Sequence, residues 1–360
     1  MKVCVYAICK NEEQFVDRWI DSMSEADEIY VLDTGSTDKT VMKLKNRGVK
    51  VRVKEIKPWR FDVARNESLK LVPEDVDICV CTDLDEVFNK GWRKRLEEIW
   101  EDDVTRLAYN YNWSFDKYNK PAVNFYIEKI HTRNDYVWTH PVHEVLSYIG
   151  NKKEVIKTED IITLNHYPDS SKSRGQYLSL LELSVKEDPT DDRNMHYLGR
   201  EYMYYGKWNE CIDTLIKHLN LEKATWKDER SASMRFISRA YVNLKRYDEA
   251  RMWLNNAINE TPYLREPYVE MAYLEYSQNN FEKAYNMLNK ALEIKEKTKS
   301  YINENFCWDS TIYDISSICC YNLGMFEESL KYVNKALELN PDDKRLKENK
   351  KIIKKHTDSV

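Results

Sequence analysis

The stretch "ICVCTDLDEVF" (Ile78–Phe88) begins with four apolar residues and ends in three acids, Asp83, Asp85 and Glu86. The apolar part predicts a buried strand. Carboxylates at the end of such a strand must be solvated, paired with protein cations or held for a bound cation, because an isolated buried charge is costly. The rest of the sequence decides between these possibilities.

Short apolar runs like this one recur along residues 1–170, and segments with helical spacing of apolar residues separate them. Strands that alternate with helices predict βαβ units and a mostly parallel sheet. Residues 106–149 carry several strand-like runs in succession, which indicates a more antiparallel region. The predicted strands of the first part are "KVCVYAI", "EIYVLD", "VKVRVKEI" and "DICVCTD".

The strand pattern ends near residue 172, and four helical segments follow it. In each segment an aromatic residue precedes a small residue by three positions, and a Leu-rich helix continues from there. The pairs are Trp208 and Cys211, Tyr247 and Ala250, Phe281 and Ala284, and Phe326 and Ser329. This pattern resembles the tetratricopeptide repeat, and the uneven spacing of the aromatic residues predicts insertions between hairpins. We therefore expect an α/β domain at residues 1–170 and an all-α helical solenoid at residues 171–360.

The composition argues against several classes of protein. A formal net charge of −5 argues against a general nucleic-acid binder, whose surface would be basic. The 8 cysteines include no C-x-x-C pair, so we expect reduced, buried thiols instead of a zinc site. No stretch approaches the ~18 apolar residues of a membrane span, and the N-terminus does not resemble a signal peptide. The expected location is the cytoplasm.

Polar motifs stand where the predicted strands give way to loops. Open α/β sheets bind their ligands at this carboxyl edge. The motifs are "ICKNEE" (Ile8–Glu13), "VLDTGSTDKT" (Val31–Thr40), "FDVARNESL" (Phe61–Leu69) and "CTDLDE" (Cys81–Glu86).

In this order, and followed by "HPVHEVL" (His140–Leu146), the motifs resemble glycosyltransferase family 2. The nearest resemblance is to a bacterial branch with bacteriocin S-glycosyltransferases and lipopolysaccharide-core-type glucosyltransferases. It implies the GT-A fold of nucleotide-diphospho-sugar transferases and inverting transfer of a sugar from a UDP-sugar. The acceptor that it implies is a peptide or protein side chain, with a cell-surface saccharide as the alternative.

A metal ion fits this chemistry. Breaking a sugar–phosphate bond builds negative charge on the departing diphosphate, and a divalent cation stabilises that charge. Mg²⁺ or Mn²⁺ would use one or two carboxylates together with the donor phosphates. By resemblance Asp85 binds the metal, and Asp83 reaches the ribose or acts through water. His143 is the expected third contact to the metal or the diphosphate, with His140 as its rival.

The resemblance also implies a nucleoside pocket. It places Asp33 against the base, with Asn11 and Glu12 in the same pocket. A buried carboxylate such as Asp33 needs hydrogen-bond partners, which a base or ribose supplies. Arg65 of "ARN" is a charge-assisted partner for the diphosphate or for Asp83.

An inverting transferase needs a base within hydrogen-bond reach of the acceptor atom. Glu144 and Glu86 are the main candidates, and Asp116 is a further one. The repeats would present a peptide or protein acceptor, or join two copies in a homodimer.

Two other functions fit parts of the pattern. A degenerate transferase domain could leave the repeats as a non-enzymatic scaffold, although five motifs in the right order argue against this. A nucleotidyltransferase would carry a Gly-rich, basic loop where this chain has "CKNEE" (Cys9–Glu13).

Overall fold

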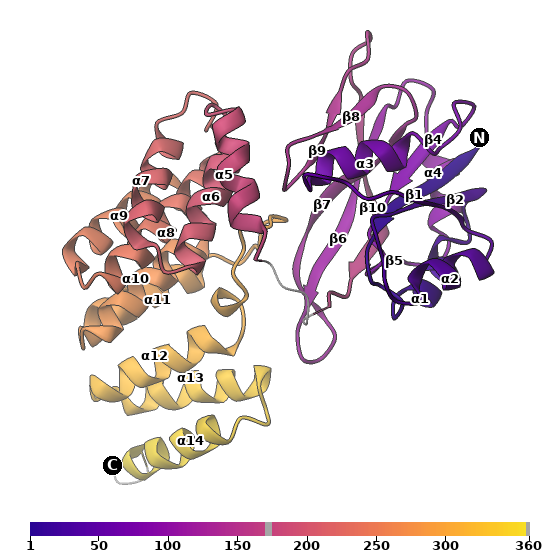
Figure 1. Ribbon diagram of the computed structural model, residues 1–360. Coiled ribbons are helices and arrows are strands. Elements are labelled where there is room, and N and C mark those ends of the chain that lie inside the picture. Colours follow the sequence, from indigo (N-terminus) through magenta and orange to yellow (C-terminus); the bar gives the residue numbers. More distant parts are fainter. Residues whose placement is uncertain (170–174, 358–360) are drawn as a thin grey trace. The chain divides into compact units, whose positions relative to one another are not determined.

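The computed structural model describes residues 1–169 and 175–357 (Figure 1). The chain divides into two compact units, Met1–Glu187 and Asp188–Val360. The first is an α/β unit and the second is entirely helical, as the sequence predicts. A boundary between functional domains near residue 170 stays a prediction.

The N-terminal unit is built on an eight-stranded sheet in the order β3, β2, β1, β4, β7, β6, β10, β5. Strands β1 to β4 run parallel, whereas β7 is antiparallel to both of its neighbours, β4 and β6. This confirms a parallel half followed by a more antiparallel one. A separate antiparallel hairpin consists of β8 and β9. The strands are β1 (Val3–Cys9), β2 (Glu28–Asp33), β3 (Lys50–Val53), β4 (Ile78–Cys81), β5 (Glu86–Phe88), β6 (Arg106–Phe115), β7 (Pro121–Thr132), β8 (Tyr136–Thr139), β9 (Val145–Tyr148) and β10 (Ile156–His166).

The two inner strands of the parallel half, β1 and β4, are covered on both faces, and for this reason they are apolar and buried throughout. Alternate residues of β1 enter different clusters: Val3 and Val5 pack with Trp19 of α1, while Cys4 and Tyr6 pack on the face that the β8–β9 hairpin covers. Cys79 and Cys81 of β4 also lie on this second face as free, buried thiols, as expected. The helices of this unit are α1 (Val16–Met23), α2 (Thr40–Asn46), α3 (Phe61–Leu69), α4 (Trp92–Ile99) and α5 (Tyr177–Glu187).

Two strands were not predicted from the sequence. Strand β5 has only three residues, too few for a periodic pattern. Strand β10 is long, but its pairing with β6 shifts between Glu159 and Thr163, and this bulge breaks the alternation of apolar and polar residues. Both strands matter for the site, because β5 begins at Glu86 and β10 ends at His166.

The C-terminal unit is a series of helical hairpins in which successive helices pack together. Each predicted aromatic residue is the first residue of the second helix of a hairpin, and the small residue three positions later is buried. The fold class predicted from the sequence is confirmed. The helices are α6 (Asp192–Tyr204), α7 (Trp208–Leu219), α8 (Lys227–Asn243), α9 (Tyr247–Glu260), α10 (Arg265–Ser277), α11 (Phe281–Glu293), η1 (Asn305–Cys307), α12 (Ser310–Asn322), α13 (Phe326–Leu339) and α14 (Lys344–Thr357).

Within residues 1–169 and 175–357, no helix combines the length and apolar character that crossing a bilayer requires.

The first hairpin offers a test of its packing. Gly199 lies on α6, where an added Cβ would overlap with Cγ and Cδ2 of Leu215 on α7. We expect Gly199→Ala to lower the free energy of unfolding by about 1–3 kcal/mol, because the buried leucine must shift. Urea denaturation followed by circular dichroism measures this loss.

The control is the double variant Gly199→Ala/Leu215→Ala. Its loss should be smaller than the sum of the two single losses, because removing the leucine side chain makes room for the new Cβ. Additive losses would show that these two residues do not limit the approach of the helices.

Candidate active site

The candidate site lies at the carboxyl ends of β1, β2 and β4. From β1 the chain adds β2 and then β3 on one side. It then crosses back, and β4 pairs on the other side of β1, so the strand order reverses between β1 and β4. Ligands of open α/β sheets bind at such a reversal. The motifs after β1, β2 and β4 therefore meet at one edge of the sheet.

Arg65 of α3 connects two predicted site residues. Its Nη2 donates to Oδ1 of Asp83 at 2.7 Å, and its Nε donates to Oε1 of Glu144 at 3.0 Å. The Arg65 side chain is only 4% exposed and lies over the ring of Trp138. The guanidinium thus fixes the loop after β4 to the turn between β8 and β9. Its pairing with Asp83 agrees with one of the two roles predicted for it.

Lys129 of β7 forms a second connection. Its ammonium lies 3.4 Å from Oδ2 of Asp83 and 3.2 Å from Oε1 of Glu86. Glu86 is 1% exposed, and it also accepts hydrogen bonds from the Tyr111 hydroxyl at 2.7 Å and from the backbone N–H of Asp83 at 2.8 Å. Glu86 therefore holds the acidic loop together through the Asp83 backbone, and it attaches the loop to the sheet through Tyr111 of β6 and Lys129 of β7.

The pKa values follow from this arrangement. Burial opposes ionisation of Asp83, but Arg65 and Lys129 outweigh it and hold the pKa of Asp83 well below its ordinary value. Burial raises the pKa of Glu86; Lys129 opposes this effect, and the negative charges of Asp83 and Asp85 reinforce it. The pKa values of these two acids, only three residues apart, are thus shifted in opposite directions. Asp83 therefore remains a carboxylate more readily than Glu86 does.

Asp85 has a different partner, His166. The two side chains are 3.4 Å apart, from Oδ2 of Asp85 to Nε2 of His166, and Nδ1 of His166 lies 3.0 Å from the carbonyl oxygen of Trp113. Burial lowers the pKa of His166, but the hydrogen bond and charge of Asp85 outweigh it, so the pKa lies above its ordinary value. The sequence did not single out His166, although its position at the end of β10, beside β5, could have indicated it had β10 been predicted.

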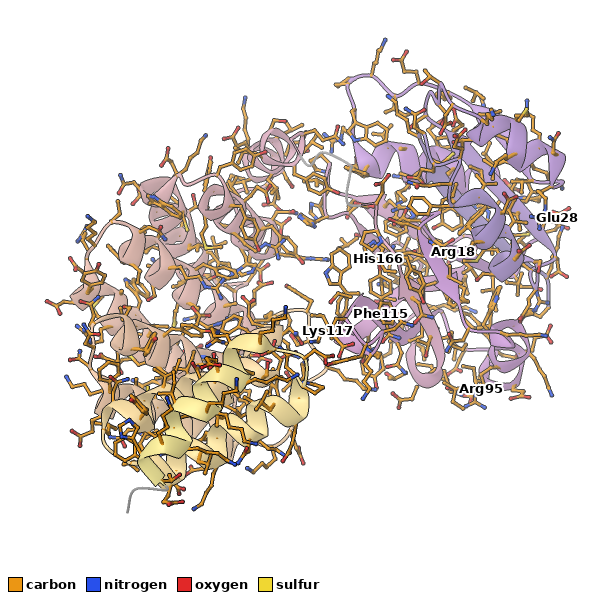
Figure 2. All side chains as sticks on the ribbon, turned by 90° about the horizontal axis from the view of Figure 1, so that it is seen from below. Arg18, Glu28, Arg95, Phe115, Lys117 and His166 are labelled. Atoms are coloured by element: carbon orange, nitrogen blue, oxygen red, sulfur yellow. The ribbon has the colours of Figure 1, made fainter. Side chains whose placement is uncertain are left out.

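An aromatic surface surrounds His166. The ring of Trp113 stacks on it at 4.5 Å between centroids, and Trp113 is 47% exposed. Phe115 and Tyr167 stack on each other at 5.2 Å, and the Arg18 guanidinium lies over Tyr167. Figure 2 labels Arg18, Phe115 and His166 in the α/β unit. Flat apolar faces are thus presented beside Asp85.

The predicted nucleoside residues meet in the loop after β2. Oδ1 of Asp33 accepts from the backbone N–H groups of Gly35 and Ser36, and its Oδ2 accepts from the Ser36 hydroxyl. The side-chain oxygen of Asn11 accepts from the Thr37 backbone N–H at 2.7 Å. These bonds hold the loops after β1 and β2 together. Contact of Asp33 with a nucleotide base stays a prediction.

Glu12 lies at the same junction. Its backbone N–H donates to the Thr40 hydroxyl at 2.8 Å, at the start of α2. The structure therefore brings Asn11, Glu12 and Asp33 together, as the resemblance implied, and their role toward a nucleoside remains a prediction.

The histidines of "HPVHEVL" lie in the turn between β8 and β9. His140 and His143 have left-handed backbone conformations, with φ of +75° and +49°. The His143 ring is 5.8 Å from that of Tyr177 in α5. A metal-binding role for either histidine stays a prediction.

Asp116 is held within the turn between β6 and β7. Its Oδ1 accepts from the backbone N–H groups of Tyr118 and Lys120, both at 2.8 Å. This arrangement shapes the turn, and a role of Asp116 as a base stays a prediction.

Asp85 and His166 could hold a divalent cation, since they offer a carboxylate oxygen and an imidazole nitrogen side by side. Asp83 is engaged by two protein cations. Across residues 1–169 and 175–357, no group of three or more His, Cys, Asp or Glu side chains is arranged to hold a metal. Two protein ligands would leave the remaining positions to a bound ligand and water. Mg²⁺ prefers oxygen ligands, so the imidazole of this pair favours a softer divalent cation such as Mn²⁺.

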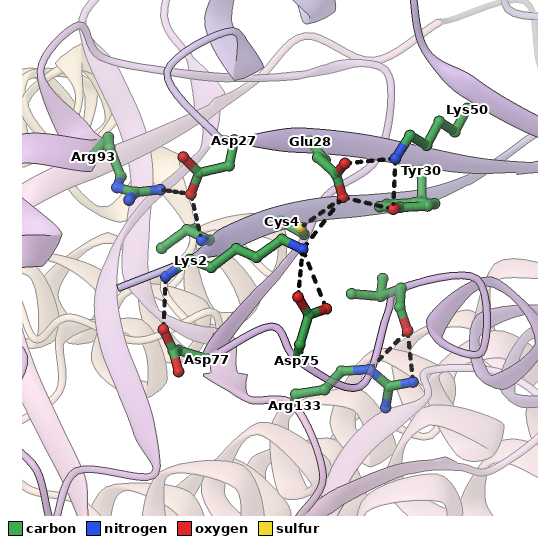
Figure 3. A network of polar contacts seen from close by, with 12 residues as sticks. Lys2, Cys4, Asp27, Glu28, Tyr30, Lys50, Asp75, Asp77, Arg93 and Arg133 are labelled. Carbon is green, nitrogen blue, oxygen red and sulfur yellow. Dashed lines mark hydrogen bonds and ion pairs between the residues drawn. The ribbon is translucent and has the colours of Figure 1, made fainter.

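A second charged network lies at the amino ends of the parallel strands (Figure 3). Oδ2 of Asp77 accepts from the Lys2 backbone N–H, Asp27 pairs with Arg93, and Glu28 pairs with Lys50. These pairs join the starts of β1, β2 and β3 to their surroundings. They lie at the edge away from the candidate site, so we assign them to the stability of the sheet.

Comparison with known families matches both units. Residues 4–157 match glycosyl transferase family 2, and residues 236–263, 266–298 and 310–343 match the tetratricopeptide repeat. The first hairpin, α6 and α7, precedes the matched repeats.

One curated relative, from Rickettsia bellii (strain RML369-C), is named an uncharacterized glycosyltransferase. It is 34% identical over 111 residues, which are 30% of this chain and 36% of the relative. This chain thus spans about a third of the length of the curated relative that it matches.

Similar solved structures include tetratricopeptide-repeat proteins. MamA is 21% identical, with a TM-score of 0.38, over 49% of this chain and 96% of MamA. TTC0263 of Thermus thermophilus is 21% identical, with a TM-score of 0.36, over 50% of this chain and 91% of its own. YrrB, described as having an unusual peptide-binding site, is 14% identical, with a TM-score of 0.37, over 49% of this chain and 83% of its own.

The buried cation of the site can be tested through stability. We expect Arg65→Met to lower the free energy of unfolding by about 3–5 kcal/mol, because Asp83 and Glu144 lose a shared buried partner. Denaturant unfolding at pH 7 without added nucleotide measures the change.

Arg60 provides a matched control at the start of the same helix. It also pairs with two carboxylates, Asp62 and Glu187, but its side chain is 22% exposed. Arg60→Met should therefore cost about 1 kcal/mol or less. Equal losses in the two variants would contradict a special role for the buried pair.

Proposed function

We propose, from the glycosyl transferase family 2 domain at residues 4–157 and the tetratricopeptide repeats that follow it, that this protein transfers a sugar from a UDP-sugar to a peptide or protein acceptor, with inversion and with Mn²⁺ or Mg²⁺. The observation that carries the proposal is the division of the acidic loop after β4. Asp83 and Glu86 are satisfied by Lys129, and Asp83 also by Arg65, whereas Asp85 is paired with His166.

The proposed donor site uses this division. Asp85 and His166 would hold the cation, with the donor diphosphate as a further ligand. The bound cation supplies charge stabilisation for the departing diphosphate. Asp83 is kept ionised and fixed in direction by Arg65 and Lys129, so it is placed to accept a hydrogen bond from the ribose. Asn11, Glu12 and Asp33 would form the nucleoside side of the pocket.

The acceptor must lose a proton, and Glu144 and Glu86 are the candidate bases. Glu144 is 13% exposed, with one oxygen held by Arg65 at 3.0 Å. Glu86 is almost fully buried and is bonded to Lys129, Tyr111 and the Asp83 backbone. A base must reach the attacking atom. We therefore propose Glu144 as the base and Glu86 as the residue that positions the loop.

The repeats are proposed to recruit the protein or peptide acceptor, since tetratricopeptide arrays present extended surfaces to partners. Association of two copies through the repeats and a cytoplasmic location both remain predictions.

A saccharide acceptor is the second candidate. It is favoured by Trp113, whose exposed ring stacks on His166 and would offer an apolar face to a sugar ring beside Asp85.

The first test concerns the metal. We expect Asp85→Asn to abolish divalent-dependent hydrolysis of UDP-sugars and to weaken Mn²⁺ binding by at least about ten-fold, because a ligand is lost. Release of UDP across a panel of UDP-sugars and electron paramagnetic resonance of free Mn²⁺ measure the two effects. Asp102→Asn, an exposed acid after α4, is the control and should behave as wild type.

The same measurements assign the histidine. His166→Asn should weaken Mn²⁺ binding as Asp85→Asn does, whereas His143→Asn should retain it. Loss in the His143 variant alone would restore the assignment that the sequence predicts. Unchanged metal-dependent hydrolysis in Asp85→Asn would refute the metal site altogether.

The second test concerns the base. We expect Glu144→Gln to lower kcat for hydrolysis of the preferred UDP-sugar by about 10²–10⁴-fold and to leave KM nearly unchanged, because deprotonation of the attacking group is impaired. Steady-state kinetics across pH measure this loss. A larger loss of kcat in a stably folded Glu86→Gln variant would reverse the two assignments.

A further inference from the structure

One segment of the helical unit lies outside the hairpins. It comprises residues 298–308, named here the inter-repeat segment, between α11 and α12. The matched repeats end at residue 298 and resume at residue 310, so the segment is the insertion that the uneven spacing predicted. Its contacts fall on α6, α8 and α10, which are the first helices of three successive hairpins. We call the surface that these three helices form under the segment the groove.

Tyr301 and Ile302 enter the groove as anchors. The Tyr301 hydroxyl donates to Oε2 of Glu229 at 2.5 Å, and its ring lies 6.0 Å from that of Tyr197 and 5.4 Å from that of Trp226. Ile302 is 8% exposed and joins the apolar cluster of α7 and α8. An aromatic and an aliphatic side chain thus occupy adjacent places.

Glu304 supplies a charge that the groove lacks. Arg235 and Arg239 share the carboxylate of Glu270, at 2.7 and 2.8 Å. Glu304 completes the balance with contacts of 2.7 Å to Arg239 and 3.6 Å to Arg235, and Arg235 also donates to the carbonyl oxygen of Ile302. Two guanidinium groups, one of them fully buried, are thus balanced by Glu270 and Glu304, and the charge of Glu266 also acts on Arg235.

The backbone of the segment is also bound by side chains. Oε1 of Glu266 accepts from the Glu304 backbone N–H at 3.2 Å and from the Trp308 indole N–H at 3.0 Å. Beyond this point the segment is anchored, because Cys307 is buried in the cluster of α10, α11 and α12. Residues 301–304 are the part that lies on the groove.

We propose that the groove is a peptide-binding site that the chain occupies with its own residues 301–304. Its ligand class is a peptide that forms a turn at a tyrosine and at the aliphatic residue directly after it, as Tyr301 and Ile302 do, with an acid three positions after the tyrosine. A partner protein with this pattern would compete with the inter-repeat segment. The proposal concerns the repeats alone and does not depend on the transferase function.

Side chains of α6, α8 and α10 hold this segment. The groove offers four kinds of contact: Glu229 for a hydroxyl, the apolar cluster for Ile302, two guanidinium groups for a carboxylate, and Glu266 for a backbone N–H. Together they recognise both the side chains and the main chain of the bound segment. Packing between α9 and α10 rests on Ala250, Leu254, Met271 and Leu274, without the segment.

The test weakens the hold of the groove on the inter-repeat segment by mutation and then adds the same sequence as a separate peptide. The full chain with Tyr301→Ala/Glu304→Ala keeps every groove residue and loses the two polar anchors. A fluorescein-labelled peptide, "TKSYINENF" (residues 298–306), is titrated by anisotropy. The peptide should bind this released variant at least about ten-fold more tightly than it binds wild type. In wild type the chain's own segment occupies the groove and competes with the peptide.

Three controls define the result. Asn305→Ala, at an exposed residue of the same segment whose side chain bonds Asp309, should bind the peptide as weakly as wild type. Adding Arg239→Ala to the released variant should remove binding. Replacing both the tyrosine and the glutamate of the peptide by alanine should also remove it. Circular dichroism and thermal melting report whether each variant folds.

Other outcomes overturn the proposal. Equal binding to wild type and to the released variant would mean that the segment does not close the groove. A folded variant without binding would mean that the groove is not a peptide site. An unfolded released variant, together with an unfolded milder Glu304→Gln variant, would make the segment a permanent part of the core.

Discussion

The buried contact between Arg65 and Asp83 is the interaction on which the candidate site depends. Three acids follow a strand that is buried on both faces, and such charge is tolerated only beside compensating charge. Arg65 and Lys129 supply it from α3 and β7. These two cations fix the direction of the loop after β4, and Arg65 also holds the β8–β9 turn that carries Glu144. Removing either cation would change the position of several other groups.

The acidic loop therefore does not act as a uniform patch of negative charge. Asp83 is paired on both oxygens, and Glu86 accepts from three donors. The partner of Asp85 is His166, whose protonated form Asp85 favours.

The sequence predicted the elements whose signals are local. Apolar strands and the polar motifs after them can be recognised from neighbouring residues. Trp208 and Tyr247 identify hairpins because each begins a helix and precedes a buried small residue by three positions. The sequence did not predict contacts made by a bulged strand. His166 lies next to Asp85 only because β10 pairs with β5, and the bulge at Glu159–Thr163 conceals β10 in the sequence. The motif histidine His143 was therefore the more visible of the two.

Both units use buried arginines that share carboxylates, but they differ in the origin of the partners. Around Arg65, Asp83 and Glu144 come from the loop after β4 and the β8–β9 turn, both set by the sheet and its hairpin, so the arrangement is fixed once the unit folds. Around Arg235 and Arg239, Glu270 comes from α10, whereas Glu304 comes from an insertion between repeats. The insertion also adds Ile302 to the apolar cluster of α7 and α8, so a carboxylate from another chain could replace Glu304 only if Ile302 were also replaced. The same physical device thus joins parts of one sheet unit around Arg65 and joins an insertion to its repeats around Arg235 and Arg239.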